Sequence, residues 1–102
     1  MQDERYSAPE FAALPQADDL RAYIEHGTPT NHFLTALLSN DLLATFGRAD
    51  ARSKAAIDDY VLWLRSYAPG HCYGSAERVE AWIAQGGLRG VASALGGDGG
   101  ER

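Results

Sequence analysis

The chain has very little cysteine and no long apolar run. Its 102 residues contain one cysteine, Cys72, so no internal disulfide can support the fold. The longest uninterrupted aliphatic and aromatic run is Val61 to Leu64, far short of the roughly 20 residues that a membrane-spanning helix needs. The charged start of the chain, Met1 to Arg5, has no apolar stretch behind it. We therefore expect no signal peptide and a cytoplasmic protein with no membrane contact.

Patterns that carry catalysis or metal binding are also missing. The single cysteine and the three histidines do not form the close-spaced ligand pairs that are typical of zinc sites. His71 and Cys72 are adjacent in a loop, where neighbouring side chains usually point apart, so His71 is a poor base for a Cys72 nucleophile. The terminal glycines follow no strand and open no helix, as a phosphate-binding loop would require. We expect no metal, no cofactor and no enzymatic activity.

Acidic residues outnumber basic ones. Fourteen Asp and Glu face nine Lys and Arg, which gives a net charge of −5 with histidine neutral. A nucleic-acid-binding domain normally has a basic face, so we expect no direct contact with nucleic acid. An acidic domain suits a partner with a basic surface, although a charge of this size also serves solubility alone.

Helical signals recur along the chain, and no segment shows sustained period-two alternation. A short first turn is predicted in which Ser7 and Glu10 form a capping box and Tyr6 packs on Phe11. Further helices are predicted from Asp18 or Asp19 to Gly27, from Thr28-Pro29 to Leu38, over Leu42, Leu43 and Phe46, and from Ser75 to Gly86. Ser39 to Asp41 separates two of them, with one kinked helix as the alternative.

The strongest helical pattern spans residues 51–68, after the N-cap Asp50. Its apolar spacing predicts that Ile57, Val61 and Leu64 are buried. The fold is therefore expected to be all-α, a single compact domain of about five short helices over residues 6–89. A flexible N-terminus at 1–5 would precede this domain, and a disordered, glycine-rich tail at 90–102 would follow it.

Two surfaces are candidate sites of protein contact. Asp58, Asp59 and Leu62 share the outer strip of the long helix, and an apolar residue ringed by charge can be the centre of a contact site. A plain solvated face is the alternative for the two aspartates. Tyr67 and Tyr73, at the helix end and in the following loop, suit an interface because tyrosine is apolar at one end and polar at the other. Cys72 is expected to pack as a small apolar residue.

Several segments between Tyr23 and Ile83 resemble a family of small phage and prophage proteins, over about six-tenths of the chain. They include Phe33 to Leu42, Phe46 to Asp50, and Tyr73-Gly74-Ser75 leading into Glu77-Arg78-Val79. The family has no assigned activity, so the resemblance implies no catalytic residue. It implies a phage-encoded accessory protein that is expressed inside a bacterium.

These observations lead to a binding protein as the main hypothesis. The protein would contact a host protein stoichiometrically and inhibit a bacterial defence system of the anti-CRISPR type by occluding a basic face. The alternative is a small helical virion or regulatory component that self-associates into a homo-oligomer. A hydrolytic or metal-dependent enzyme is the least favoured of the three hypotheses.

Overall fold

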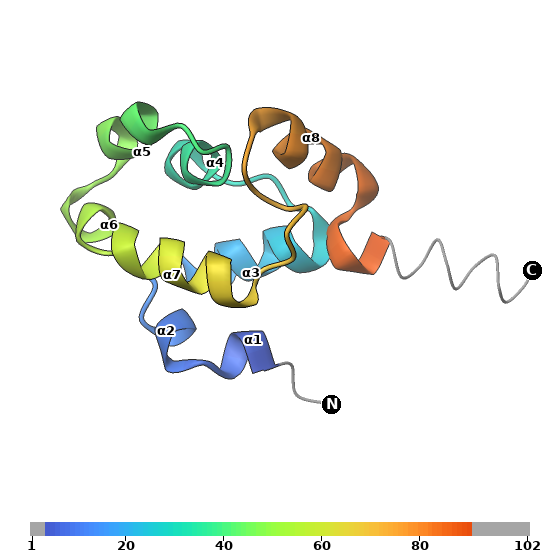
Figure 1. Ribbon diagram of the computed structural model, residues 1–102, viewed down its shortest axis with the longest axis horizontal. Helices are drawn as coiled ribbons and strands as arrows, with labels where there is room; N and C mark the ends of the chain where they lie inside the picture. The colour runs from blue at the N-terminus through green and yellow to red at the C-terminus, as the bar shows by residue number, and fades with distance from the viewer. Residues whose placement is uncertain (1–3, 91–102) are drawn as a thin grey trace, which may run out of the picture.

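The computed structural model describes residues 4–90, and within that range the fold is all-α, as expected (Figure 1). Residues 1–3 and 91–102 lie outside the described residues, and they include all of the tail predicted at 90–102 except Gly90. Gly87 to Gly90 form a further helical turn after the last of eight labelled helices. These are α1 (Glu4–Ser7), α2 (Pro9–Ala12), α3 (Ala17–His26), α4 (His32–Leu38), α5 (Leu42–Arg48), α6 (Ala51–Ala55), α7 (Ile57–Tyr67) and α8 (Ala76–Gln85).

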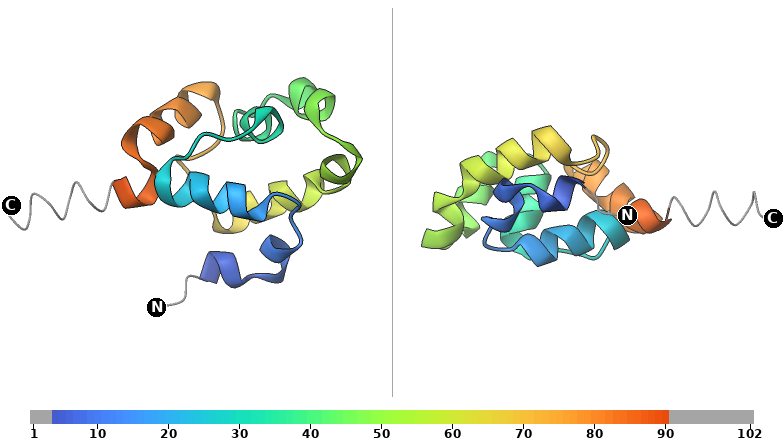
Figure 2. Two further views of the ribbon diagram at one scale, coloured as in Figure 1. Left: turned by 180° about the vertical axis from the view of Figure 1, so that it is seen from behind. Right: turned by 90° about the horizontal axis from the view of Figure 1, so that it is seen from below.

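The helices are arranged at three levels. In Figure 1, α3 and α7 run through the middle, with α1 and α2 below them and α4, α5 and α8 above. The view from below in Figure 2 shows α1 and α2 lying between α3 and α7, so the N-terminal segment covers one side of the core. The largest fully buried side chains come from α3 and α7 in the middle, from α4 above them and from the loop before α8: Trp63, Tyr23, Tyr60, Leu20, Ile24, Leu34, Leu38 and Cys72.

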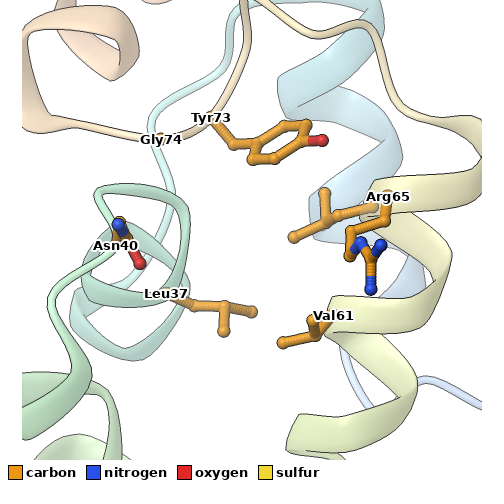
Figure 3. A pocket seen from close by; sticks show the side chains of 7 residues that line it. Leu37, Asn40, Val61, Arg65, Tyr73 and Gly74 are labelled. Atoms are coloured by element: carbon orange, nitrogen blue, oxygen red, sulfur yellow. The ribbon is translucent and has the colours of Figure 1, made fainter.

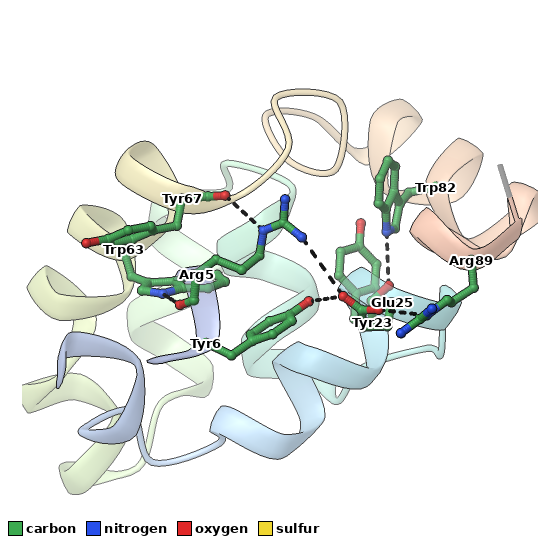
Figure 4. Close-up of polar contacts among 8 residues, drawn as sticks. All are labelled: Arg5, Tyr6, Tyr23, Glu25, Trp63, Tyr67, Trp82 and Arg89. Carbon is green, nitrogen blue, oxygen red and sulfur yellow. Dashed lines mark hydrogen bonds and ion pairs between the residues drawn. The ribbon is translucent and has the colours of Figure 1, made fainter. Parts of the chain in front are cut away.

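Glu25 ties the N-terminal segment to α3 and to the last helical turn (Figure 4). It is only 9% exposed, and the Tyr6 hydroxyl donates to its Oε2 at 2.5 Å. Arg89 lies 2.9 Å from its Oε1, and Arg5 lies 4.0 Å from its Oε2. The indole of Trp63 also donates to the Arg5 carbonyl at 2.8 Å. A buried carboxylate needs such partners, and we infer that this cluster is structural. Glu4 and Arg5, which we expected in the flexible N-terminus, instead begin α1.

Two glycines bring the ends of α3 and α8 into backbone contact. Gly27 caps α3 in the left-handed region with φ +70°, and a Cβ on it would lie 2.9 Å from the Gly87 nitrogen. Beside this contact, the Trp82 indole donates to the Tyr23 carbonyl at 3.0 Å. A side chain at residue 27 would therefore meet both a strained φ and a backbone neighbour.

Three predicted helix starts were wrong. The helix expected from Thr28-Pro29 begins at His32, because the side chain of Asn31 accepts the Leu34 N–H at 2.9 Å and caps it. Pro9 fixes the start of α2, so its N-cap is Ala8 and Ser7 ends α1. The predicted packing of Tyr6 on Phe11 is present nevertheless, with ring centroids 5.2 Å apart.

The third wrong start concerns α3. Its N-cap is Gln16, without a side-chain cap, and Asp18 and Asp19 fall in the first turn. The Gln16 N–H is instead satisfied by the Tyr60 hydroxyl at 3.0 Å. Two aspartates in a first turn still suit the positive end of the helix dipole.

The long helix predicted over 51–68 is divided at Ala56. This residue leaves helical geometry, with φ −99° and ψ 2°, and its N–H bonds to the Ser53 carbonyl three residues back. The break is one reason why the helices outnumber the five expected. The other predicted boundaries, at Gly27, Ser39–Asp41, Asp50, Ser75 and Gly86, are confirmed.

The prediction that Val61 is buried was wrong, since 42% of it is exposed. Ile57 and Leu64 are buried as predicted, at 8% and 4% exposure. The buried face of α7 is centred on Tyr60 and Trp63, which are both fully buried. Because successive helical residues are rotated by about 100°, this centre leaves Val61 at the margin of the face.

Candidate functional site

The large apolar side chains that residues 4–90 leave exposed belong to only two helices. On α5 they are Leu42, Leu43 and Phe46, with 65%, 85% and 45% of their surface exposed. We call these three residues the α5 face. On α7 they are Val61 and Leu62, with 42% and 51% exposed. A contiguous exposed apolar patch marks an interaction site more often than a single exposed apolar side chain does.

The α5 face arises because α5 is oriented with its polar residue inward. Thr45 is the residue of α5 that is buried, at 3% exposure. Its hydroxyl donates to the Asp41 carbonyl at 2.6 Å, so the inward position costs no unsatisfied polar group. Asp41 also caps the helix by accepting the Ala44 N–H at 3.1 Å. Since α5 packs mainly on α4, no described helix covers its apolar outer side.

A groove of about 260 Å³ lies between α4 and α7 (Figure 3). Leu37 of α4 and Val61 of α7 point toward one another across it, and the ring of Tyr73 closes one end. Arg65 and Asn40 supply its polar groups. We call this the α4–α7 groove; it is lined by Leu37, Asn40, Val61, Leu64, Arg65, Tyr73 and Gly74. Apolar walls with a few polar groups at the rim suit the insertion of a partner's side chain.

The loop that carries Tyr73 is held by hydrogen bonds from three elements. The Tyr23 hydroxyl of α3 donates to the Cys72 carbonyl at 2.6 Å. The Gly74 N–H donates to the Leu38 carbonyl at the end of α4 at 2.7 Å. Arg78 of α8 donates to the Tyr73 carbonyl at 3.5 Å. These bonds fix the loop backbone, so Tyr73 reaches the groove from a defined position.

The structure separates the two tyrosines that the sequence grouped together. Tyr73 lines the α4–α7 groove, half-buried. Tyr67 lies on the side of α7 that faces α1, where its ring is 6.2 Å from that of Trp63 and its carbonyl accepts from Arg5 at 3.3 Å (Figure 4). The two side chains therefore belong to different surfaces, and only Tyr73 lies in the groove.

The outer strip of α7 consists of Asp58, Asp59, Val61, Leu62, Arg65 and Ser66, all exposed. We call it the α7 strip. It contains the three strip residues that the sequence analysis proposed as a contact site, with Val61 added because that residue is not in the core. Val61 and Arg65 also line the α4–α7 groove, so the strip and the groove adjoin.

The one cysteine is unsuited to nucleophilic chemistry. Cys72 is fully buried, as expected, and burial raises the pKa of its thiol to about 12. The thiol is thus protonated at neutral pH and is not accessible from the surface. Among residues 4–90, no three His, Cys, Asp or Glu side chains gather as a metal site would require.

Comparison of the chain with protein-family models finds no match, and neither does comparison with curated proteins or with solved structures. Within the described part of the chain, no helix combines the length and the apolar character that crossing a membrane requires.

Sequence reasoning did not identify the α5 face. The pattern of Leu42, Leu43 and Phe46 with Thr45 between them shows that the helix has an apolar side. It does not show which way that side faces, because an apolar side is normally turned toward the core. The one sequence signal for an exposed face was the short segment between Asp41 and Gly47, because a short helix offers little surface for other helices to cover.

Proposed function

We propose that this protein acts by stoichiometric binding to another protein, with the α5 face as the contact surface. The observation that carries the proposal is the exposure of Leu42, Leu43 and Phe46 at 65%, 85% and 45% on one short helix. Their transfer from water to a partner's surface would be favourable at about 25 cal/mol per Å² of apolar area.

The charge of the protein bears on how a partner is attracted rather than on where it binds. The net charge of −5 favours approach by a protein with a basic surface. Charges next to the α5 face are mixed, with Asp41 before it and Arg48 at its end. The apolar contact therefore supplies the specific affinity, while the electrostatic field of the net negative charge speeds association with the partner at low salt.

The more specific form of the proposal rests on the resemblance to small phage and prophage proteins. In that form the partner is a host protein inside a bacterium, and binding inhibits a defence system of the anti-CRISPR type without catalysis. A basic nucleic-acid-binding face of the host protein would be blocked by an acidic protein of this size. The support for this form is the resemblance, the charge and the inaccessible thiol.

Capture from host extract with matched variants tests the contact surface. Tagged wild-type protein, Leu43→Glu and Ala81→Glu are compared at low salt. Ala81 is exposed on α8, so its variant adds the same charge away from the α5 face. We expect wild type and Ala81→Glu to retain the same host protein and Leu43→Glu to lose it.

Thermal melting followed by circular dichroism verifies that each variant is folded. Retention of no host protein by folded wild type contradicts binding to a host protein. Equal retention by Leu43→Glu and wild type would instead rule out the α5 face as the contact surface.

A further inference from the structure

The charges along the α7 strip are arranged so that a second copy of the strip, running in the opposite direction, would place opposite charges side by side. Asp58 lies at its N-terminal end, Val61 and Leu62 in the middle, and Arg65 at its C-terminal end. All four residues are exposed. Among the described residues, neither Asp58 nor Arg65 has an ion-pair partner, since the ion pairs found there all involve Glu25. The acidic and the basic end of the strip are thus both available to a partner.

Helix geometry prevents the two ends from neutralising each other. Asp58 and Arg65 are seven residues apart on one face, which separates their Cα atoms by about 10 Å along the axis at 1.5 Å per residue. Side chains on a helix pair at spacings of three or four residues, so this pair is out of reach within one copy. Leu62 lies between them, at i+4 from Asp58 and i−3 from Arg65.

An antiparallel copy of α7 brings opposite charges to the same level. If the two-fold axis passes midway between Val61 and Leu62, Asp58 of each copy lies level with Arg65 of the other. The same axis places Val61 of each copy level with Leu62 of the other. Two ion pairs would then flank an apolar centre, and both halves of the contact would be identical, as a two-fold interface requires.

We propose that the α7 strip is the interface of a homodimer in which two copies of α7 pack antiparallel. A second copy fits the strip better than a basic partner does, because Arg65 would repel a uniformly basic surface while Asp58 attracts it. One strip of an eleven-residue helix is a small contact, so the dimer is reversible and depends on concentration. This interface is separate from the α5 face, which stays available to another protein.

Exchange of the two charges tests the proposed pairing. Asp58→Arg makes residues 58 and 65 both basic, and Arg65→Asp makes both of them acidic. Each variant alone repels its own copy, and an equimolar mixture restores both ion pairs in a heterodimer. Mass is measured by light scattering after size exclusion over a range of concentrations, with Glu77→Arg on α8 as a control that has the same charge change as Asp58→Arg.

We expect wild type and Glu77→Arg to dimerise alike, and each strip variant to dimerise at least about tenfold more weakly. The mixture should regain dimerisation, which misfolding of a variant would not produce. A wild type that stays monomeric at every concentration overturns the proposal, as does a mixture that associates no better than its components. Leu43→Glu should still dimerise and Asp58→Arg should still capture the host protein, so the two proposals fail independently.

Discussion

Truncation of Leu64 should destabilise the fold far more than truncation of Leu62, two residues away on α7. Leu64 is 4% exposed, whereas Leu62 is 51% exposed. Truncation of a buried leucine to alanine costs about 2–5 kcal/mol of unfolding free energy. Leu64 also borders the groove of about 260 Å³, so its truncation widens a space that is already open to water. We therefore expect Leu64→Ala to cost about 2–3 kcal/mol, in the lower half of that range.

Leu62→Ala should change the unfolding free energy by no more than about 0.5 kcal/mol, as exposed substitutions do. In a domain of this size, 1 kcal/mol moves the melting temperature by about 4–8 °C, so Leu64→Ala should melt at least about 8 °C lower. Urea and thermal unfolding are followed by far-UV circular dichroism at low protein concentration, so that self-association does not add stability. Equal destabilisation by both substitutions would place Leu62 in the core and refute both the α7 strip and the dimer.

Three further predictions concern the packing around the loop and the helix ends. A left-handed conformation alone costs a non-glycine residue about 1–2 kcal/mol. Gly27→Ala should lower the free energy of unfolding by more than this, because its Cβ would lie 2.9 Å from the Gly87 nitrogen. Gly47→Ala, which meets no atom within 4 Å, should be neutral or stabilising, and equal melting of the two variants would contradict this. Tyr23→Phe should lose about 1–3 kcal/mol in urea unfolding, because it leaves the buried Cys72 carbonyl without its donor; no loss would show the bond to be dispensable. Because the pKa of Cys72 is raised to about 12, the folded state keeps a proton that the unfolded chain loses above about pH 9. Stability should therefore fall as pH rises from 9 toward 12, and Cys72→Ala should fall less steeply between pH 9 and 10; equal slopes would contradict burial of the thiol.

Local chemistry predicted where several helices begin or end. Gly27 and Gly86 adopt the left-handed conformation that such caps need, and Asp50 and Ser75 cap the helices that follow them. Each of these residues acts on its own neighbours in sequence, so the pattern is sufficient. Ile57 and Leu64 were likewise placed correctly in the core, because they share one apolar face of a strongly periodic segment.

Features that depend on distant contacts could not be predicted in this way. Thr28 and Asn31 are both acceptable caps, and Asn31 also donates to the Gln16 side chain at 2.6 Å, fifteen residues away. Val61 follows the apolar spacing of α7, yet Tyr60 and Trp63 take the centre of the buried face. The exposure of the α5 face could not be predicted for the same reason. Periodicity shows that a helix has an apolar face, but not whether another element covers that face.

The most direct test of the proposed binding surface is hydrogen exchange of the protein alone and in complex with the host protein that it retains. Exposed backbone on a short helix with one main neighbour should exchange readily in the free protein. We predict that binding slows exchange in peptides covering α5, residues 42–48, and leaves α8, residues 76–85, unchanged. Slowed exchange at α8 with none at α5 would show that the partner binds another surface and would contradict the central claim.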